Sequence, residues 1–157
     1  MQIRRAEIKD IEKIDEMLVQ VNLLHHNGRP DIFKPNQKKY SDEQLKALFQ
    51  DDDKPIFVAT DDNDVALGYV FCIIQQHKND SILTDIKTLY IDDLCVDEHR
   101  RGEKIGKLLL NFAFEYAKKI GCYNVTLNAW CLNQNALNFY TANGMNPMKV
   151  YMEKILD

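Results

Sequence analysis

Residues 86–110, IKTLYIDDLCVDEHRRGEKIGKLLL, carry the pattern that decides the fold. Their first part, residues 86–96, is a mostly apolar run with two adjacent acidic residues, which predicts a long β-strand. Apolar residues then recur at helical spacing over residues 105–120, which predicts an amphipathic helix. The turn between the two and the first residues of the helix contain four cations, namely Arg100, Arg101, Lys104 and Lys107. We therefore expect a strand, a basic turn and a helix in succession.

The chain before this stretch predicts a short edge strand, two helices and a hairpin. Residues 2–5 fit the edge strand, and an amphipathic helix follows that ends near Gly28. A capping-box pattern begins a second helix at Ser41. Residues 56–60 and 65–75 then predict two strands, joined by an acidic turn.

The chain after this stretch predicts a strand, a helix and a final strand, at residues 125–130, 133–143 and 149–155. The order is β-α-α-β-β-β-α-β-α-β, an antiparallel meander joined to a β-α-β unit. We expect an α/β fold with a mixed, mostly antiparallel twisted sheet flanked by helices. Residues 1–157 are expected to form a single domain.

Composition narrows the class of protein. The 157 residues include 20 Lys and Arg against 24 Asp and Glu, a formal net charge of −4, which argues against a nucleic-acid partner. No run of 18 uncharged apolar residues occurs, so we expect neither a membrane span nor a signal peptide. The four cysteines, Cys72, Cys95, Cys122 and Cys131, lack metal-site and disulfide spacing, so we expect reduced thiols, a cytoplasmic protein and no metal.

The basic turn has the wrong charge for an ordinary helix start. A helix N-terminus carries partial positive charge, so each cation there costs about 0.3–1 kcal/mol. Gly106 costs about another 0.5–1 kcal/mol relative to Ala. A bound phosphate or pyrophosphate would take the free N–H groups and neutralise the cations. The alternative is a solvated turn in which Gly102 is only a turn residue. The P-loop and dinucleotide-binding patterns are both absent.

Two segments together resemble the GNAT superfamily of N-acetyltransferases. VDEHRRGEKIGKLLL is similar to the family's acetyl-CoA motif R/Q-x-x-G-x-G/A, with Arg101 first, Gly106 last and Lys104 in place of a usual glycine. LNAWCLNQNALNFYTANGM resembles the motif N-x-x-A-x-x-F-Y-x-x-x-G-F, and its matching residues are Asn133, Ala136, Phe139, Tyr140 and Gly144. The closing KVYMEKIL resembles the family's final strand.

The resemblance implies an acetyl-CoA site. The pantetheine arm would pair with the strand at Leu94, Cys95 and Val96. The pyrophosphate would bind the basic turn and helix start, at Arg101, Gly102, Glu103, Lys104, Ile105, Gly106 and Lys107. Asn133, Ala136 and Phe139 would lie beside the cofactor arm, although Asn133 has an alternative role as a helix N-cap.

Acetyl transfer to an amine needs a neutral amine, a donor for the developing oxyanion and a proton for the leaving thiolate. In this family Tyr140 would be the general acid, with a packing aromatic as the alternative. Asp92 is our choice for the base or amine-binding carboxylate, and Asp93 is the reserve. Strand alternation places the two on opposite faces unless a bulge shifts them. A backbone N–H near residues 94–96 would meet the oxyanion.

The acceptor follows only from a resemblance to diamine acetyltransferases around YIDDLCV and NFY, which implies a small cationic amine or polyamine. A peptide or protein N-acetyltransferase and a non-catalytic acyl-CoA sensor are the alternatives. His25 and His26 either line the acceptor site or complement the C-terminus of their helix. Relatives often form dimers, so a homodimer is possible.

Overall fold

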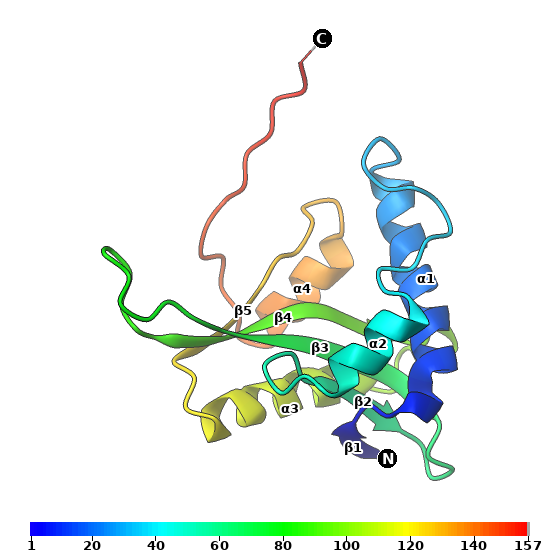
Figure 1. Cartoon of the computed structure of the whole chain (residues 1–157). Helices are drawn as coiled ribbons and strands as arrows, with labels where there is room; N and C mark the ends of the chain where they lie inside the picture. Colours follow the sequence, from blue (N-terminus) through cyan, green and yellow to red (C-terminus); the bar gives the residue numbers. More distant parts are fainter. Residues whose placement is uncertain (157) are drawn as a thin grey trace.

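The computed structural model describes residues 1–156 as an open sheet with helices on both faces (Figure 1). The elements, in chain order, are β1 (Gln2–Arg5), α1 (Ile11–Gly28), α2 (Asp42–Phe49), β2 (Ile56–Thr60), β3 (Ala66–Gln76), β4 (Lys87–Val96), α3 (Ile105–Lys119), β5 (Asn124–Leu127) and α4 (Gln134–Ala142). None of the helices within residues 1–156 is long and apolar enough to cross a bilayer.

The sheet is mixed, as predicted. Its strand order is β1-β2-β3-β4-β5, with antiparallel neighbours up to β4 and a parallel β4–β5 pair. The parallel pair follows from α3, which crosses over between the two strands. The α/β fold class is therefore confirmed.

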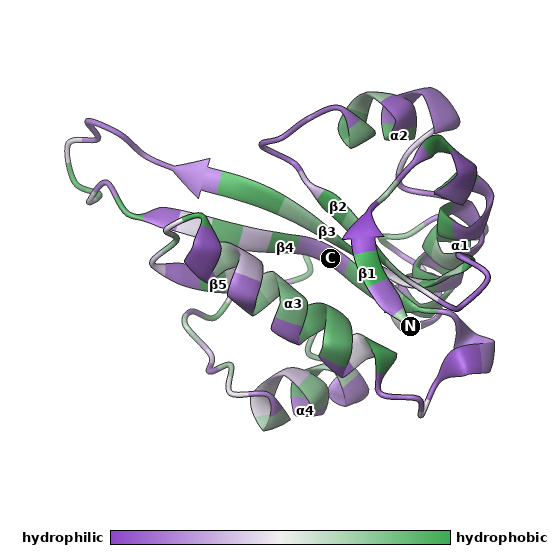
Figure 2. Cartoon of the chain, turned by 90° about the horizontal axis from the view of Figure 1, so that it is seen from below, coloured by the Kyte–Doolittle hydropathy of each residue, from purple (hydrophilic) through white to green (hydrophobic). Residues whose placement is uncertain are grey.

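Two apolar cores lie on the two faces of the sheet. The first core packs beneath α1 and α2, and the second beneath α3 and α4. Strand alternation divides the side chains between them: Ile56 and Val58 of β2 enter the first core, whereas Phe57 and Ala59 enter the second. Figure 2 shows α3 and α4 on one side of the sheet and α1 and α2 on the other.

A bulge in β4 changes which way its two carboxylates point. Phe71 pairs with Asp93 and Cys72 pairs with Ile91, so Asp92 is an extra residue in β4. Asp92 is held by Tyr40, and Asp93 by Tyr69 of the first core. Both carboxylates therefore lie on the α1–α2 face, and the simple alternation that separates them does not apply.

The predicted last strand, residues 149–155, is wrong for the single chain. Residues 146–156, here called the tail, are extended but belong to no strand, and they leave the body of the protein beyond α4 (Figure 1). Met145 packs against the second core, and Arg29 binds Glu153 of the tail. The strand-like sequence of the tail has no partner strand within residues 1–156.

The contact between β3 and α3 depends on a glycine. A Cβ at Gly68 would lie 2.8 Å from the Cys95 carbonyl oxygen and 3.1 Å from Leu109 Cδ1. We therefore expect Gly68→Ala to lower the free energy of unfolding by about 1–3 kcal/mol, measured by urea denaturation. Gly106→Ala is the matched control, because its Cβ would meet Phe139 at an ordinary 3.5 Å. Equal stability of the two variants would contradict the close β3–α3 contact.

Candidate active site

One edge of β4 is open at its C-terminal half. β5 pairs with β4 only from Thr88 to Ile91, whereas β3 pairs with it as far as Val96. Asp97 N–H donates to the Leu67 carbonyl of β3, so alternation turns the backbone groups of Cys95 toward β3 as well. The backbone groups of Leu94 and Val96 point to the open edge instead. Of the three residues predicted to pair with the cofactor arm, Leu94 and Val96 are therefore available and Cys95 is not.

Gln20 of α1 braces the end of this edge. Its Nε2 donates to the Val96 carbonyl at 3.0 Å and lies 3.2 Å from Cys95 Sγ, while its Oε1 accepts from Glu98 N–H at 3.0 Å. The Cys95 side chain is buried, and burial raises the pKa of its thiol to about 12. Cys95 is therefore a structural residue of β4, fixed from α1.

The N-terminus of α3 has no side-chain cap. Lys104 occupies the N-cap position, and the first intrahelical N–H bond at this end runs from Leu108 to the Lys104 carbonyl. The N–H groups of Ile105, Gly106 and Lys107 therefore lack intrahelical partners. The Ile105 side chain is buried in the second core, so only its backbone faces the turn. Three free N–H groups at a helix start are able to bind an anion.

The cations of the turn differ in how they are paired. Arg100 donates through Nε and Nη2 to the two carboxylate oxygens of Glu103, at 2.7 and 2.9 Å. The charge of this arginine is therefore already neutralised, and Glu103 is its partner. Within residues 1–156, Arg101, Lys104 and Lys107 form no ion pair with a carboxylate. Three cations thus remain for an anion at the start of α3. If the turn is only solvated, the three cations and the free N–H groups at the start of α3 have no binding partner.

Lys104 has a left-handed backbone, with φ of 63°, which explains why glycine is usual at this position in the family. We expect Lys104→Gly to raise the free energy of unfolding by about 1 kcal/mol, because glycine adopts this conformation without a Cβ penalty. Lys104→Ala removes the same charge but keeps the Cβ penalty, so in urea denaturation its gain should be smaller than that of Lys104→Gly by about 1 kcal/mol. Equal gains in the two variants would mean that only charge repulsion, and not backbone strain, is relieved.

The second motif packs directly on the first. Asn133 caps α4, since its Oδ1 accepts from Ala136 N–H at 3.1 Å, so Asn133 takes the N-cap role. A Cβ at Gly106 would lie 3.5 Å from Phe139 Cζ and 3.6 Å from Val96 Cγ2. Phe139 therefore lies beside both the α3 start and the open edge of β4.

Tyr140 lies next to Phe139, with ring centroids 5.2 Å apart, and partly buried in the second core. Burial, followed by electrostatic interaction with Asp93 and Cys95, raises the pKa of its phenol to about 12. None of the side chains within residues 1–156 hydrogen-bonds its Oη. Tyr140 is thus a protonated donor without a side-chain partner.

Asp93 is the carboxylate with the altered pKa. Its Oδ2 accepts a hydrogen bond from Tyr69 Oη at 3.0 Å. Burial raises the pKa of Asp93 to about 6, against the opposing effects of the Tyr69 bond and the Lys39 charge. Burial also raises the pKa of Tyr69, which keeps its phenol a donor. Asp93 can therefore accept a proton near neutral pH.

Asp92 is occupied by other partners. Its Oδ2 binds Lys39 Nζ at 2.7 Å and accepts from Tyr40 Oη at 2.8 Å. Both partners come from the segment before α2, where Tyr40 stacks on Phe71. This geometry suits a residue that fixes the α1–α2 segment to β4 better than it suits a free base.

His25 lies in an aromatic group at the end of α1. Its ring centroid is 5.0 Å from that of Phe33 and 6.3 Å from that of Trp130. These side chains border a cavity of about 360 Å³ that extends to Asn133 at the start of α4. Burial, then the Lys39 charge, lowers the pKa of His25, so the ring is neutral at pH 7. His26 instead holds the Phe33 carbonyl at 2.7 Å through Nδ1.

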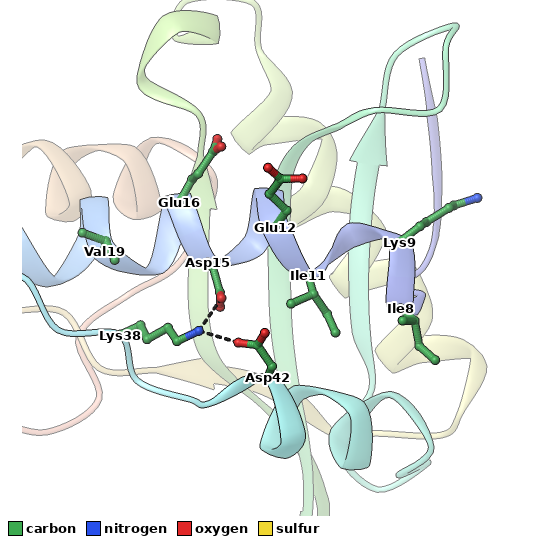
Figure 3. A pocket seen from close by; sticks show the side chains of 9 residues that line it. All are labelled: Ile8, Lys9, Ile11, Glu12, Asp15, Glu16, Val19, Lys38 and Asp42. Carbon is green, nitrogen blue, oxygen red and sulfur yellow. Dashed lines mark hydrogen bonds and ion pairs between the residues drawn. The ribbon is translucent and has the colours of Figure 1, made fainter.

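A larger hollow of about 870 Å³ lies between α1 and the start of α2 (Figure 3). Lys38 bridges Asp15 and Asp42 across it, and Glu12 and Glu16 line its rim. None of the predicted site residues borders this hollow. The predicted site residues therefore lie elsewhere, on α1, on β4, at the start of α3 and on or beside α4.

Comparison with known proteins decides the family. A family model described as the acetyltransferase (GNAT) family matches residues 22–145, which contain the open edge, the α3 start and α4. The chain belongs to the GNAT acetyltransferase family. Members of this family use acetyl-CoA as a co-substrate. The free N–H groups at the α3 start and the open edge of β4 fit such a molecule.

Two curated GNAT relatives are similar in sequence. Glucosamine 6-phosphate N-acetyltransferase from Arabidopsis thaliana is 29% identical over 102 residues, covering 57% of this chain and 66% of that protein. An uncharacterized N-acetyltransferase from Methanocaldococcus jannaschii is 31% identical over 120 residues, covering 76% of this chain and 51% of that protein. The matches therefore span about two thirds and about half of the lengths of these relatives.

Solved structures agree with the fold. A mutant of the BH1408 protein from Bacillus halodurans aligns with a TM-score of 0.94 at 31% identity, over 99% of both chains. The crystal structure of the Arabidopsis glucosamine-6-phosphate N-acetyltransferase aligns with a TM-score of 0.71 at 25% identity, over 99% of this chain and 98% of that one.

Four side chains that hydrogen-bond to β4 were not predicted from the sequence. They are Gln20, which binds Val96, Lys39 and Tyr40, which bind Asp92, and Tyr69, which binds Asp93. Tyr69 offered one usable signal, because a tyrosine in a strand of apolar residues needs a partner for its hydroxyl. The others lie on or beside helices, where nothing local marks their contact with β4.

Proposed function

We propose that this GNAT protein transfers the acetyl group of acetyl-CoA to the primary amine of a small cationic molecule in a ternary complex. One observation carries the proposal. The open edge of β4, the uncapped start of α3 and the protonated Tyr140 meet around Val96, Gly106 and Phe139. The edge suits the amide arm of the co-substrate, and the helix start suits its pyrophosphate.

Each group of the chain has a role in this proposal. Ile105, Gly106 and Lys107 hold the phosphates through their N–H groups, with Arg101 and Lys104 neutralising charge. Bound acetyl-CoA supplies an activated acyl carbon and a thiolate leaving group. Leu94 N–H or Val96 N–H, at the open edge, donates to the acyl oxygen as charge develops on it.

Proton transfers in the proposal use Asp93 and Tyr140. Asp93, with a pKa of about 6, is ionised at pH 7 and removes a proton from the incoming ammonium or amine, directly or through water. Tyr140, with a pKa of about 12, keeps its proton until the sulfur leaves and then donates it. Asp93 therefore replaces Asp92, our first choice from the sequence, as the proposed base.

The cavity at the end of α1 supports a cationic acceptor. Phe33 and Trp130 present aromatic faces that attract ammonium groups, and the neutral His25 adds no repelling charge. Asp93 lies on the same α1–α2 face of the sheet. The free thiols of the four cysteines support a reducing, cytoplasmic location.

An amino-sugar phosphate is the second candidate acceptor, because the Arabidopsis relative is a glucosamine 6-phosphate N-acetyltransferase. The cavity gives less support to this acceptor. Among its lining residues the cation is Arg29, which already binds Asp31 and Glu153. A phosphate there would have to displace a carboxylate.

Thiol release from acetyl-CoA, measured across a panel of acceptors, tests the proposal. The panel contains diamines and polyamines, aminoglycosides, amino acids, glucosamine 6-phosphate and peptides with a free α-amine. We expect the highest kcat/KM with a diamine or polyamine. Faster turnover of glucosamine 6-phosphate or of a peptide would reassign the acceptor. Calorimetric binding of acetyl-CoA with no turnover of any amine would favour a sensor.

A further inference from the structure

Two neighbouring lysines before α2 have different partners. Lys38 bridges Asp15 and Asp42 across the hollow between α1 and α2 (Figure 3). Lys39 instead reaches β4, where its Nζ lies 2.7 Å from Asp92 Oδ2. One segment therefore presents one primary amine to the hollow and the next one to the carboxylates of β4.

Lys39 lies close to the proposed base. Its partner Asp92 is the residue next to Asp93, and the β4 bulge places both carboxylates on the α1–α2 face. The Lys39 charge opposes the burial that raises the pKa of Asp93, and it acts after burial in lowering the pKa of His25. The Lys39 ammonium is thus within electrostatic range of Asp93 and of the cavity at the end of α1.

The Lys39 amine can leave Asp92 and move along β4. Its side chain is 46% exposed, so water surrounds much of the flexible four-carbon stem. Tyr40 also donates to Asp92, at 2.8 Å, so this carboxylate keeps a partner when the lysine moves. Leu94, whose N–H faces the open edge, is two residues beyond Asp92, about 7 Å along the strand. Rotation of the lysine stem covers such a distance.

We propose that Lys39 is a self-acetylation site: when no acceptor is bound, Lys39 Nζ takes the acetyl group of acetyl-CoA held at the open edge of the same chain. The inference rests on the proposed function, because it uses the same co-substrate and the same proton transfers. Lys39 is the primary amine that the fold itself supplies beside Asp93.

The transfer uses the groups already assigned. Asp93 removes one proton from the Lys39 ammonium, and the nitrogen lone pair forms the new N–C bond as the C–S bond breaks. Tyr140 protonates the leaving thiolate and recovers the second nitrogen proton through water. The products are an amide at Lys39, a free thiol and one proton, which Asp93 returns to solvent.

Acetylation changes how the segment before α2 is held. A neutral amide forms no ion pair with a carboxylate, so the Lys39–Asp92 pair is lost. Of its two side-chain hydrogen bonds within residues 1–156, Asp92 then keeps the one from Tyr40. The modification therefore loosens the contact between this segment and β4, next to the proposed base.

Incubation with acetyl-CoA in the absence of an acceptor is the first test. Wild-type protein should release one thiol per chain, and peptide mass spectrometry should find the acetyl group on Lys39 and not on Lys38. Lys39→Arg keeps a cation for Asp92 but has no amine to acetylate, so it should release no thiol. The rate constant should not depend on protein concentration, because the transfer occurs within one chain. A rate constant that rises with concentration, or acetylation of both lysines alike, overturns the proposal.

Lys118 is the reference for direct chemical acetylation. It is also ion-paired, with Glu115, but it lies on α3 and its side chain is 72% exposed. Tyr140→Phe should slow acetylation of Lys39 by about tenfold or more and leave Lys118 unchanged. Acetylation of Lys39 no faster than that of Lys118, or equally fast in the variant, means that the site is not used and overturns the proposal.

A diamine added to wild-type protein separates this inference from the proposed function. Turnover of the diamine, together with an unmodified Lys39 in the acceptor-free sample, overturns the self-acetylation site and leaves the proposed function standing. Acetylation of Lys39 without turnover of any amine in the panel supports the site and overturns the proposed acceptor. Absence of both reactions overturns both.

Discussion

Tyr140→Phe is expected to lower kcat at least tenfold in the thiol-release assay while acetyl-CoA still binds. The phenol is the proposed proton donor to the leaving sulfur, and general acid–base catalysis contributes about 10²–10⁴ in rate when no other donor substitutes. The phenylalanine ring keeps the packing against Phe139 and the second core, so the fold and the co-substrate site should be preserved. Calorimetry with acetyl-CoA measures whether the variant still binds the co-substrate.

Tyr123→Phe is the matched control for this change. Tyr123 is 75% exposed and precedes β5, outside the proposed machinery, so removing its hydroxyl should leave kcat unchanged. Because the pKa of Tyr140 is about 12, loss of its proton should not limit activity below about pH 10. Unchanged turnover in Tyr140→Phe would remove this residue from the mechanism.

The central β4–α3 unit was predictable from sequence because its signals are local. Apolar run length indicated the strand and helical spacing indicated the helix, and the structure contains both. The anion inferred from the cations at the helix start stays a prediction. The motif helix and its Asn133 cap were likewise visible in the order of residues. Such features depend on neighbours within one turn or one strand.

The assignment of the base was not predictable in this way. Asp92 becomes a bulge residue because β3 pairs on either side of it, and this register depends on Phe71 and Cys72, which lie far from it in the sequence. The pKa of Asp93 depends on how deeply the folded chain covers it, with Tyr69 contributing from β3. Alternation along β4 alone separates Asp92 from Asp93, whereas the bulge brings both carboxylates to the α1–α2 face.

The tail shows a different limit. Its alternating pattern predicted a strand, but a strand needs a neighbour, and the tail has none within residues 1–156. Its side-chain hydrogen bonds to the rest of the described chain join Glu153 to Arg29. The alternating apolar pattern shows that a segment tends to pair as a strand. Which strand it pairs with depends on the sheet edges that the folded protein leaves open, and these are not visible in the local sequence.

Asp93→Asn is expected to lower kcat by about 10²–10⁴, the contribution of a positioned base. In the wild-type protein, kcat/KM should fall as pH drops through about 6, because protonated Asp93 cannot accept a proton. This fall is the acidic limb of the pH profile, and kcat/KM of the Asp93→Asn variant should not show it. Asp92→Asn is the matched control, since it removes a neighbouring charge of the same strand but should retain the limb. A limb that disappears with Asp92 instead would return the role to that residue.

The same variant should also change how stability depends on pH. The folded pKa of Asp93, about 6, lies above its ordinary value of 3.8, so the folded protein binds this proton more tightly than the unfolded chain. The stability contributed by Asp93 is thus fully present below pH 3.8 and is lost as pH rises through 6. At pH 8, Asp93→Asn should therefore be more stable than wild type by about 2–3 kcal/mol, a gain that disappears near pH 4. Urea denaturation at the two pH values measures the difference. A gain of equal size at both would mean that Asp93 is not a destabilising buried charge, and the reason for assigning it as the base would fail with it.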